Sequence, residues 1–385
     1  MPPRAESYVI PVRLDDALAR LEAEAGRAAV VSGGTVLSLN RAPRIVTLID
    51  LLRCGLDEIE ISSKAARLGA TVSAAAIAGQ PKLDAFGAGI LREAAAAIAP
   101  QAVRNQVTLG GNLVGVLSWT DLPVALMAVG ARVQTARSGG FGRRLSLEEL
   151  FAAHPRKILK RDELIVSVEI DRPAKTTGGA FIKLTPTISD VAWVNAAAVL
   201  DVRDGVCHSA RVAVGAVQPR HFRATDTEKL LVGKKLTSEL VAEAAAAGAS
   251  NVKIWGDVRA SKTYRARVLE VAIRRALATA WKRAHGRERY EAPRRVMPPP
   301  WTRKPAGPDV GHILTARIDG STHRIRIQPQ EVLLTALRRG GVLSVKRGCD
   351  EGYCGTCAVS VDGRLMNACM TFAAQVDGCE ITTAS

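Results

Sequence analysis

The sequence predicts an α+β protein built from more than one domain. Up to His285, short β-type runs alternate with helical patterns, and no Gly-x-Gly-x-x-Gly or Walker motif appears among them. A stretch rich in proline and charge follows, and the last segment has its own hairpin signals. The chain has 385 residues, 47% of them hydrophobic, which suffices for two or three cores. We expect domains over 1–172, 173–285 and 310–385, with a linker over 286–309.

The first domain is expected to open with an extended segment and a helix whose periodicity runs to Ala25. An apolar strand, Ala29–Val31, then leads into Ser32-Gly33-Gly34-Thr35. Further apolar runs predict the rest of the domain. The expected strands are 46–50, 59–61, 67–72 and 131–135, and the expected helices are 83–98 and the segment ending at Ala128.

Two Gly-Gly turns occur in this first domain. Ser32-Gly33-Gly34-Thr35 follows an apolar strand, and Thr108-Leu109-Gly110-Gly111-Asn112 follows another apolar segment. Such turns present consecutive backbone N–H groups and a hydroxyl, which suit an anionic phosphate. Each alone could be a simple turn, but the two together can converge on one diphosphate.

The second domain should combine a hairpin with helices. A strand begins at Gly179, and residues 196–202 and 209–217 flank the turn Asp204-Gly205. Helices are expected over 221–231, 238–246 and 264–285. His154, His208 and His285 have no Glu or Cys at ligand spacing, so we interpret them as structural or surface residues.

Four of the seven cysteines lie near the end of the chain with the spacing C-x4-C-x2-C-x11-C. They are Cys349, Cys354, Cys357 and Cys369. This opening is typical of plant-type [2Fe–2S] sites, in which one loop wraps the cluster and a fourth thiolate closes it. Gly348, Gly352 and Gly355 would supply the backbone freedom and close approach that such a loop requires.

The same cysteines could also form a zinc site or a disulfide. A zinc site would favour paired knuckles, and only Cys354 and Cys357 form one. A disulfide would need an oxidising compartment, to which nothing in the chain points. The flanks predict a small β-rich domain: hairpin turns at Asp319-Gly320 and Asp362-Gly363, and a helix over 332–339.

The net charge is +16, which first suggests nucleic acid. The charges are scattered without a recognition motif, so a solvated surface or a docking face for an acidic partner is the better interpretation. The start lacks the apolar core of a signal peptide, and the most apolar run, 191–200, is too short to span a bilayer. We expect a cytoplasmic protein, with Cys54 and Cys207 as buried thiols.

The segment from Arg347 through Cys369 resembles the cluster domain of the molybdenum hydroxylase (xanthine oxidase and carbon monoxide dehydrogenase) family. The two Gly-Gly turns, with Asp121-Leu122-Pro123, resemble the FAD loops of the same family's flavin subunit. The resemblance implies a two-lobed FAD-binding domain of the vanillyl-alcohol-oxidase type, an α+β C-terminal domain, and a β-grasp ferredoxin-like domain. It covers nearly the whole chain.

The resemblance also implies roles for single residues. The first loop, Val31 to Val36, would hold the diphosphate through Ser32, Gly33, Gly34 and Thr35, although many members carry a polar residue where Val36 stands. Thr108, Gly110, Gly111 and Asn112 would hold diphosphate and ribose. Asp121 would accept from a hydroxyl of the flavin side chain. Ile165, Lys183 and Trp193 would lie near the flavin ring. Trp193 fits a buried core residue on a strand equally well.

By this resemblance the chain is an electron-transfer polypeptide that binds FAD and one [2Fe–2S] cluster. A molybdopterin-binding large subunit would hold the substrate, and electrons would pass from molybdenum through iron–sulfur to FAD and an acceptor. The resemblance also implies a hetero-oligomer, and we assign no residue of this chain as a general acid or base. The cluster domain here follows the flavin domain, unlike the usual order. Family cluster subunits also continue into a helical domain with a second set of four cysteines, and this sequence stops at Ser385, where that domain would begin. A second [2Fe–2S] cluster would therefore sit on another chain, lie outside this sequence or not exist.

Two other functions compete with electron transfer in a molybdenum hydroxylase. A flavin reductase fused to a ferredoxin would also end in a C-x4-C-x2-C domain, but it would need a nicotinamide loop and an Arg-x-Tyr-Ser motif, and neither is present. An iron–sulfur redox sensor fits the cysteines and the basic charge, but leaves the paired Gly-Gly turns unexplained.

Overall fold

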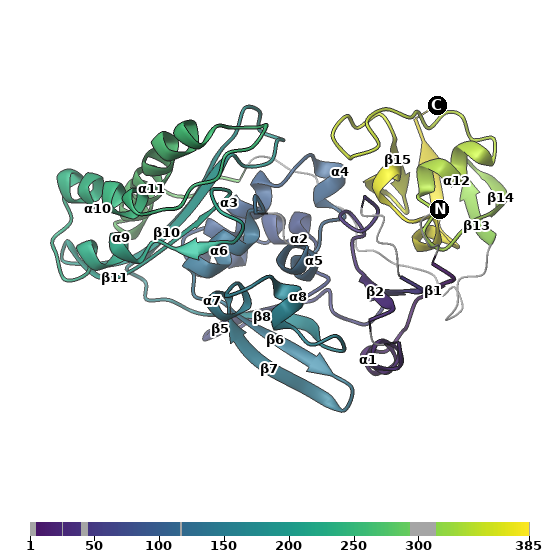
Figure 1. Cartoon of the computed structure of the whole chain (residues 1–385), viewed down its shortest axis with the longest axis horizontal. Coiled ribbons are helices and arrows are strands. Elements are labelled where there is room, and N and C mark those ends of the chain that lie inside the picture. Colours follow the sequence, from purple (N-terminus) through teal and green to yellow (C-terminus); the bar gives the residue numbers. More distant parts are fainter. Residues whose placement is uncertain (1–4, 25, 40–44, 116–117, 293–312, 385) are drawn as a thin grey trace.

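The computed structural model describes residues 5–24, 26–39, 45–115, 118–292 and 313–384. The strands form four sheets in an elongated molecule, and the sheets of the first and last parts of the chain lie side by side at one end of it (Figure 1). The predicted α+β class is confirmed. Among the described residues, no helix has the length and apolar character needed to cross a membrane. The predicted proline-rich part of the linker falls outside the described residues.

The first lobe is a three-stranded parallel sheet beside one helix. Its strand order is β1-β3-β2, and helix α1 packs Ala17, Leu18 and Leu21 into a core with Val9 and Ile49. Each of these strands is only three or four residues long. The bounds are β1 (Ser7–Val9), α1 (Leu14–Ala23), β2 (Ala28–Val31) and β3 (Thr47–Asp50).

The second lobe is a five-stranded antiparallel sheet in the order β4-β5-β8-β6-β7, with short helices over its buried face. Hairpin β6–β7 projects from this lobe (Figure 1). The strands are β4 (Ile59–Ile61), β5 (Ala65–Gly69), β6 (Arg132–Arg137), β7 (Gly140–Ser146) and β8 (Leu164–Asp171). The helices are α2 (Ala74–Gly79), η1 (Pro81–Ala85), α3 (Ile90–Ala97), α4 (Gln101–Arg104), α5 (Leu109–Val114), α6 (Leu122–Ala128), α7 (Leu147–Leu150) and α8 (Pro155–Ile158).

The middle unit is a four-stranded antiparallel sheet, β12-β11-β10-β9, covered by three helices. Helix α11 packs along β9 and β10, and α10 packs on α11. The bounds are β9 (Thr177–Leu184), β10 (Val194–Arg203), β11 (Val206–Gly215), β12 (Phe222–Arg223), α9 (Thr225–Leu231), α10 (Ser238–Ser250) and α11 (Lys262–Ala284).

The C-terminal unit, residues 313–384, is a β-grasp sheet. A hairpin, β13–β14, pairs in parallel with β17, and β17 continues into the antiparallel pair β15–β16. Helix α12 buries Leu333, Leu334 and Leu337 against this sheet. The bounds are β13 (Ile313–Ile318), β14 (Ser321–Arg326), α12 (Leu333–Arg339), β15 (Ala358–Val361), β16 (Arg364–Asn367), η2 (Ala368–Met370), η3 (Ala373–Val376) and β17 (Glu380–Thr383).

Two predicted helices were wrong in their extent. The helix expected over 83–98 is divided, because Gly87, Ala88 and Gly89 all have positive φ angles that interrupt it. The helix expected from His221 begins at Thr225, because Phe222 and Arg223 form a strand edge with β11. In both places, tertiary pairing and backbone conformation override the helical pattern of the sequence.

Candidate functional site

The four cysteines of the predicted cluster site lie in two pairs. The backbone N–H of Cys349 donates to Cys354 Sγ (3.4 Å) and that of Cys354 donates to Cys349 Sγ (3.4 Å). Cys357 and Cys369 are buried and hydrogen-bonded to each other through their side chains. In a [2Fe–2S] cluster each iron takes two thiolates, so two pairs are the donor set that such a cluster needs.

A site for a single ion fits this arrangement less well. Among the described residues, no three His, Cys, Asp or Glu side chains converge to hold one metal ion. The seven cysteines are all free thiols in this structure, so no pair of them forms a disulfide. Cys54 and Cys207 are buried, as predicted.

The cluster loop is shaped by its glycines and by N–H groups that face sulfur. Glu351 and Tyr353 both donate their backbone N–H to Cys349 Sγ. Gly352 has φ +82°, and a Cβ there would stand 2.0 Å from Met370 Sδ. Gly348 needs its missing Cβ for a different reason, because a Cβ would stand 2.7 Å from Cys354 Sγ. These contacts let the loop close around sulfur ligands.

The two Gly-Gly turns meet in space. A Cβ on Gly33 would lie 1.8 Å from the carbonyl oxygen of Gln106, so only glycine permits this approach. Val36 reaches the end of α5 beside Gly115. The second pair of glycines does not lie in a loop, however. Thr108 caps α5 through its hydroxyl, and Gly110 and Gly111 form the first turn of that helix.

The residues of these turns fit a polar ligand such as FAD. Ser32 Oγ and Asn112 Oδ1 are buried and have no hydrogen-bond partner among the described residues. A buried polar atom without a partner costs about 1–3 kcal/mol, so such atoms call for a partner that the chain itself does not provide. Gly34 has φ +74°, which turns the chain sharply at the same place.

Asp121 lies at the N-terminal end of α6 and is joined to the middle unit. Lys183 Nζ contacts Asp121 Oδ2 (3.1 Å) and Asn195 Nδ2 donates to Asp121 Oδ1 (2.9 Å). Burial raises the pKa of the Asp121 carboxyl, while Lys183 and Asn195 oppose that shift. A carboxylate has about four lone-pair sites, so these two bonds leave room for the hydroxyl of a ligand.

The other predicted flavin neighbours have more ordinary surroundings. Ile165 is buried in the core of the second lobe together with Leu109. Trp193 is half-buried, and its ring meets Tyr264 edge-on at 5.4 Å between centroids. The structure therefore brings Asp121 and Lys183 together directly, whereas Trp193 is paired with an aromatic residue that the sequence did not single out.

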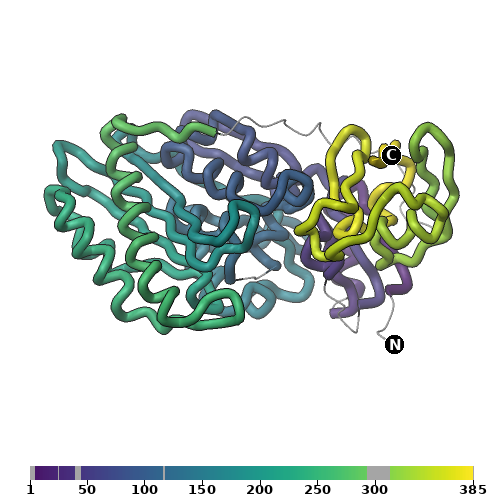
Figure 2. The backbone as a smooth tube through the Cα atoms, turned by 90° about the horizontal axis from the view of Figure 1, so that it is seen from above, coloured from purple at the N-terminus to yellow at the C-terminus, as the bar shows by residue number. Residues whose placement is uncertain are grey.

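The C-terminal unit docks on the first Gly-Gly turn, beside the first lobe (Figures 1 and 2). Gln375, which is 2% exposed, donates to the carbonyl oxygen of Ser32 (3.0 Å) and to Asp50 Oδ2 (3.3 Å). Phe372 and Gln375 also lie against Gly34. One apolar core runs through both parts and contains Tyr8 and Phe372.

A second set of buried contacts joins the C-terminal unit to the segment before α5. Gln106 donates to Thr371 Oγ1 (2.6 Å) and accepts from the backbone N–H of Asn367 (3.2 Å). Asn105 donates to the carbonyl oxygen of Leu365 (2.9 Å). The sequence did not single out Asn105, Gln106 or Gln375, because an isolated amide residue has no characteristic spacing.

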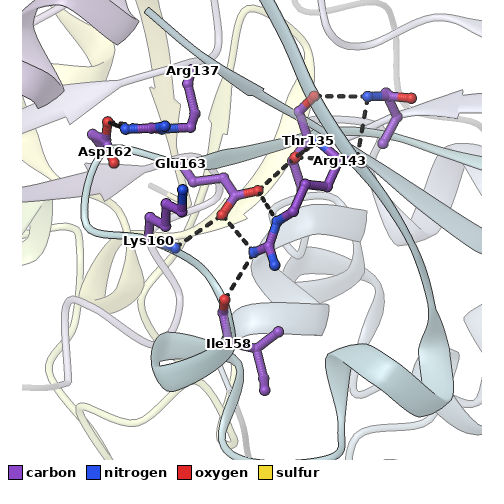
Figure 3. A network of polar contacts seen from close by, with 8 residues as sticks. Thr135, Arg137, Arg143, Ile158, Lys160, Asp162 and Glu163 are labelled. Carbon is purple, nitrogen blue, oxygen red and sulfur yellow. Dashed lines mark hydrogen bonds and ion pairs between the residues drawn. The ribbon is translucent and has the colours of Figure 1, made fainter.

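A polar network supports hairpin β6–β7 near its turn (Figure 3). Glu163 accepts from Arg143, from Thr135 Oγ1 (2.7 Å) and from the backbone N–H of Lys160 (2.9 Å). Burial raises the pKa of Glu163, but these hydrogen bonds outweigh burial and lower the pKa to about 2. A cavity of about 240 Å³ lies beside this network, between it and the hairpin tip.

Comparison with known proteins agrees with this geometry. Residues 4–173 match the FAD binding domain in molybdopterin dehydrogenase, residues 180–280 the CO dehydrogenase flavoprotein C-terminal domain, and residues 316–377 the 2Fe-2S iron-sulfur cluster binding domain.

Individual relatives cover either the flavin part or the cluster part. The 6-hydroxypseudooxynicotine dehydrogenase complex subunit alpha of Paenarthrobacter nicotinovorans is 33% identical over 74% of this chain and 97% of its own. The iron-sulfur-binding subunit of aldehyde oxidoreductase from Escherichia coli O157:H7 is 44% identical over 18% of this chain and 31% of its own. The crystal structure of quinoline 2-oxidoreductase from Pseudomonas putida 86 has a chain that is 30% identical, with a TM-score of 0.67, over 74% of this chain and 99% of that chain.

The chain therefore belongs to the family of FAD-binding medium subunits of molybdenum hydroxylase oxidoreductases, and it carries a 2Fe-2S ferredoxin-type domain at its C-terminal end. The predicted family and fold are confirmed. Relatives in this family are subunits of multi-subunit complexes.

Proposed function

We propose that the chain carries electrons between a molybdopterin-binding large subunit and an acceptor, through its [2Fe–2S] cluster and then FAD. The observation that supports this most is the docking of the C-terminal unit on the first Gly-Gly turn through Gln375 and Phe372. Such docking would hold the proposed cluster and FAD sites at a constant position relative to each other within one chain. The cofactors supply the redox chemistry, and the protein sets their position, burial and hydrogen bonds.

The proposed sites are those the sequence predicted. Cys349, Cys354, Cys357 and Cys369 would hold the cluster, with N–H groups of the loop directed at sulfur. FAD would lie on the two Gly-Gly turns, satisfy Ser32 Oγ and Asn112 Oδ1, and extend past Asp121. The domain boundaries proposed are 1–172, 173–285 and 310–385, with 286–309 as linker.

The proposed setting is a cytoplasmic hetero-oligomer. The seven free thiols suit a reducing compartment. Relatives named as subunits of complexes support a partnership with a molybdopterin-binding chain. A second [2Fe–2S] cluster is proposed on a separate chain.

The first test is cofactor content after anaerobic purification. We expect about one FAD, two irons and two acid-labile sulfides per chain. Cys369→Ser should lose most of the iron and sulfide, whereas Cys207→Ser, a buried thiol outside the site, should keep both. Iron without flavin would overturn the FAD assignment and favour a sensor. FMN in place of FAD would favour the fused flavin reductase.

The second test addresses electron transfer directly. We would photoreduce the flavin of the loaded protein with a sacrificial donor and follow bleaching of the cluster absorbance. Reduction of the cluster with the same time course in a range of protein concentrations indicates transfer within one chain. A rate that rises with protein concentration would contradict the proposal, because it requires collisions between molecules.

A further inference from the structure

The segment Ser118–Asp121, which leads into α6, is held along its whole length by the middle unit. Every one of its residues has a separate contact. Ala216 N–H donates to Ser118 O (2.7 Å), and the Arg259 guanidinium lies 4.1 Å from the centre of the Trp119 ring. His221 Nε2 lies 3.0 Å from Thr120 Oγ1. Asn195 and Lys183 both contact the carboxylate of Asp121.

His221 is the least expected of these residues. It is 4% exposed, its ring meets Phe151 edge-on, and burial lowers its pKa to about 4, which keeps the ring neutral. Among the described residues, the partner of its Nε2 is the hydroxyl of Thr120. A neutral buried imidazole can make this bond but offers no charge to Asp121, so its effect must pass through Thr120.

The His221 ring packs closely against the backbone of Gly215. A Cβ on Gly215 would lie 2.7 Å from His221 Nδ1 and 2.4 Å from Asn195 Oδ1. Glycine at 215 thus lets His221 and Asn195 reach the same segment from adjacent strand ends. Asn195 also donates to the carbonyl oxygen of Thr120 (3.2 Å), so Asn195 holds the backbone of Thr120 while His221 contacts its side chain.

We propose that His221, acting through Thr120, is a positioning residue that fixes Asp121 for FAD. This inference rests on the proposed FAD site. It goes beyond that site because it assigns a role to a residue of the middle unit that lies outside both Gly-Gly turns. Loss of the bond removes one restraint on Thr120 and loosens the segment, and Asp121 then spends less time where the ligand needs it.

The experiment measures the dissociation constant of FAD for the full-length apoprotein by quenching of flavin fluorescence. The variants are His221→Leu, His221→Gln, Thr120→Val and the double variant His221→Leu/Thr120→Val. Glutamine can place a polar atom near the position of Nε2, and valine is isosteric with threonine without its hydroxyl. Thr322→Val, on an exposed strand of the C-terminal unit, is the matched control.

We expect His221→Leu and Thr120→Val each to weaken FAD binding about tenfold, which corresponds to one buried hydrogen bond. The double variant should bind no more weakly than Thr120→Val alone, because that substitution already removes the bond to His221. His221→Gln should restore binding to within about threefold of wild type. Thr322→Val should bind as wild type does.

Three results would overturn the inference: wild-type affinity in Thr120→Val, equal affinity in His221→Leu and His221→Gln, or effects that multiply in the double variant. Thr120→Val decides alone if His221→Leu fails to fold, since it preserves shape. A wild-type apoprotein that binds no FAD refutes the proposed function instead, and the two failures are thereby distinguished.

Discussion

Gln375 offers the sharpest test of how the C-terminal unit is attached. Its side chain makes at least three hydrogen bonds with described residues: it donates to Ser32 O (3.0 Å) and to Asp50 Oδ2 (3.3 Å), and its Oε1 accepts from the backbone N–H of Phe372 (3.2 Å). Gln375→Ala removes all three and leaves a buried carbonyl and carboxylate with fewer partners. At about 1 kcal/mol for each bond, the attachment should weaken by about 3 kcal/mol.

The assay is amide hydrogen exchange, because local opening reports the free energy that holds a segment closed. A loss of about 3 kcal/mol should speed exchange in residues 31–36 roughly a hundredfold. Gln328→Ala is the matched control, since Gln328 lies exposed on the same unit and its loss should change stability by less than about 0.5 kcal/mol. Exchange in 31–36 that is equal in both variants would refute the reasoning.

Three further perturbations test neighbouring parts of the structure. Gly33→Ala should abolish retention of FAD, because the new Cβ would meet Gln106 O at 1.8 Å, and flavin released on denaturation measures this directly. Lys183→Met should lower the free energy of unfolding by about 3–5 kcal/mol in urea, because it leaves the Asp121 carboxylate buried without its cation. A second substitution, Asp121→Asn, should restore part of that free energy because it removes the unpaired charge. The lowered pKa of Glu163 stabilises the fold above pH 4.5, and this contribution is lost as pH falls from 4.5 toward about 2. Glu163→Gln should therefore unfold with a shallower pH dependence in that range, and an unchanged slope would contradict the assignment.

The cluster site was the part most open to prediction from the sequence. Ligand spacing on one loop is a local property, so the run from Cys349 to Cys357 could be interpreted without knowledge of the fold. The pairing of Cys357 with Cys369 could not be derived in the same way, because it depends on how β15 and β16 return the chain to the loop.

The meeting of the two Gly-Gly turns was predictable only as a hypothesis. Glycine indicates that a close approach is needed, but it does not say to which atom. Gly33 approaches Gln106 O, a backbone atom with no sequence signature. The same limit applies to Gly215, whose missing Cβ makes space for Asn195 and His221. Such contacts follow from tertiary packing rather than from a motif.

The order of the domains along the chain does not determine how they meet. The C-terminal unit lies beside the first lobe, so Gln375 contacts Ser32 across most of the sequence (Figure 2). Buried amides make this contact directional, because each must satisfy its donors and acceptors in one arrangement, whereas an apolar interface tolerates sliding. The hydrogen bonds of Gln106 and Gln375 therefore hold the C-terminal unit in one position against the rest of the chain.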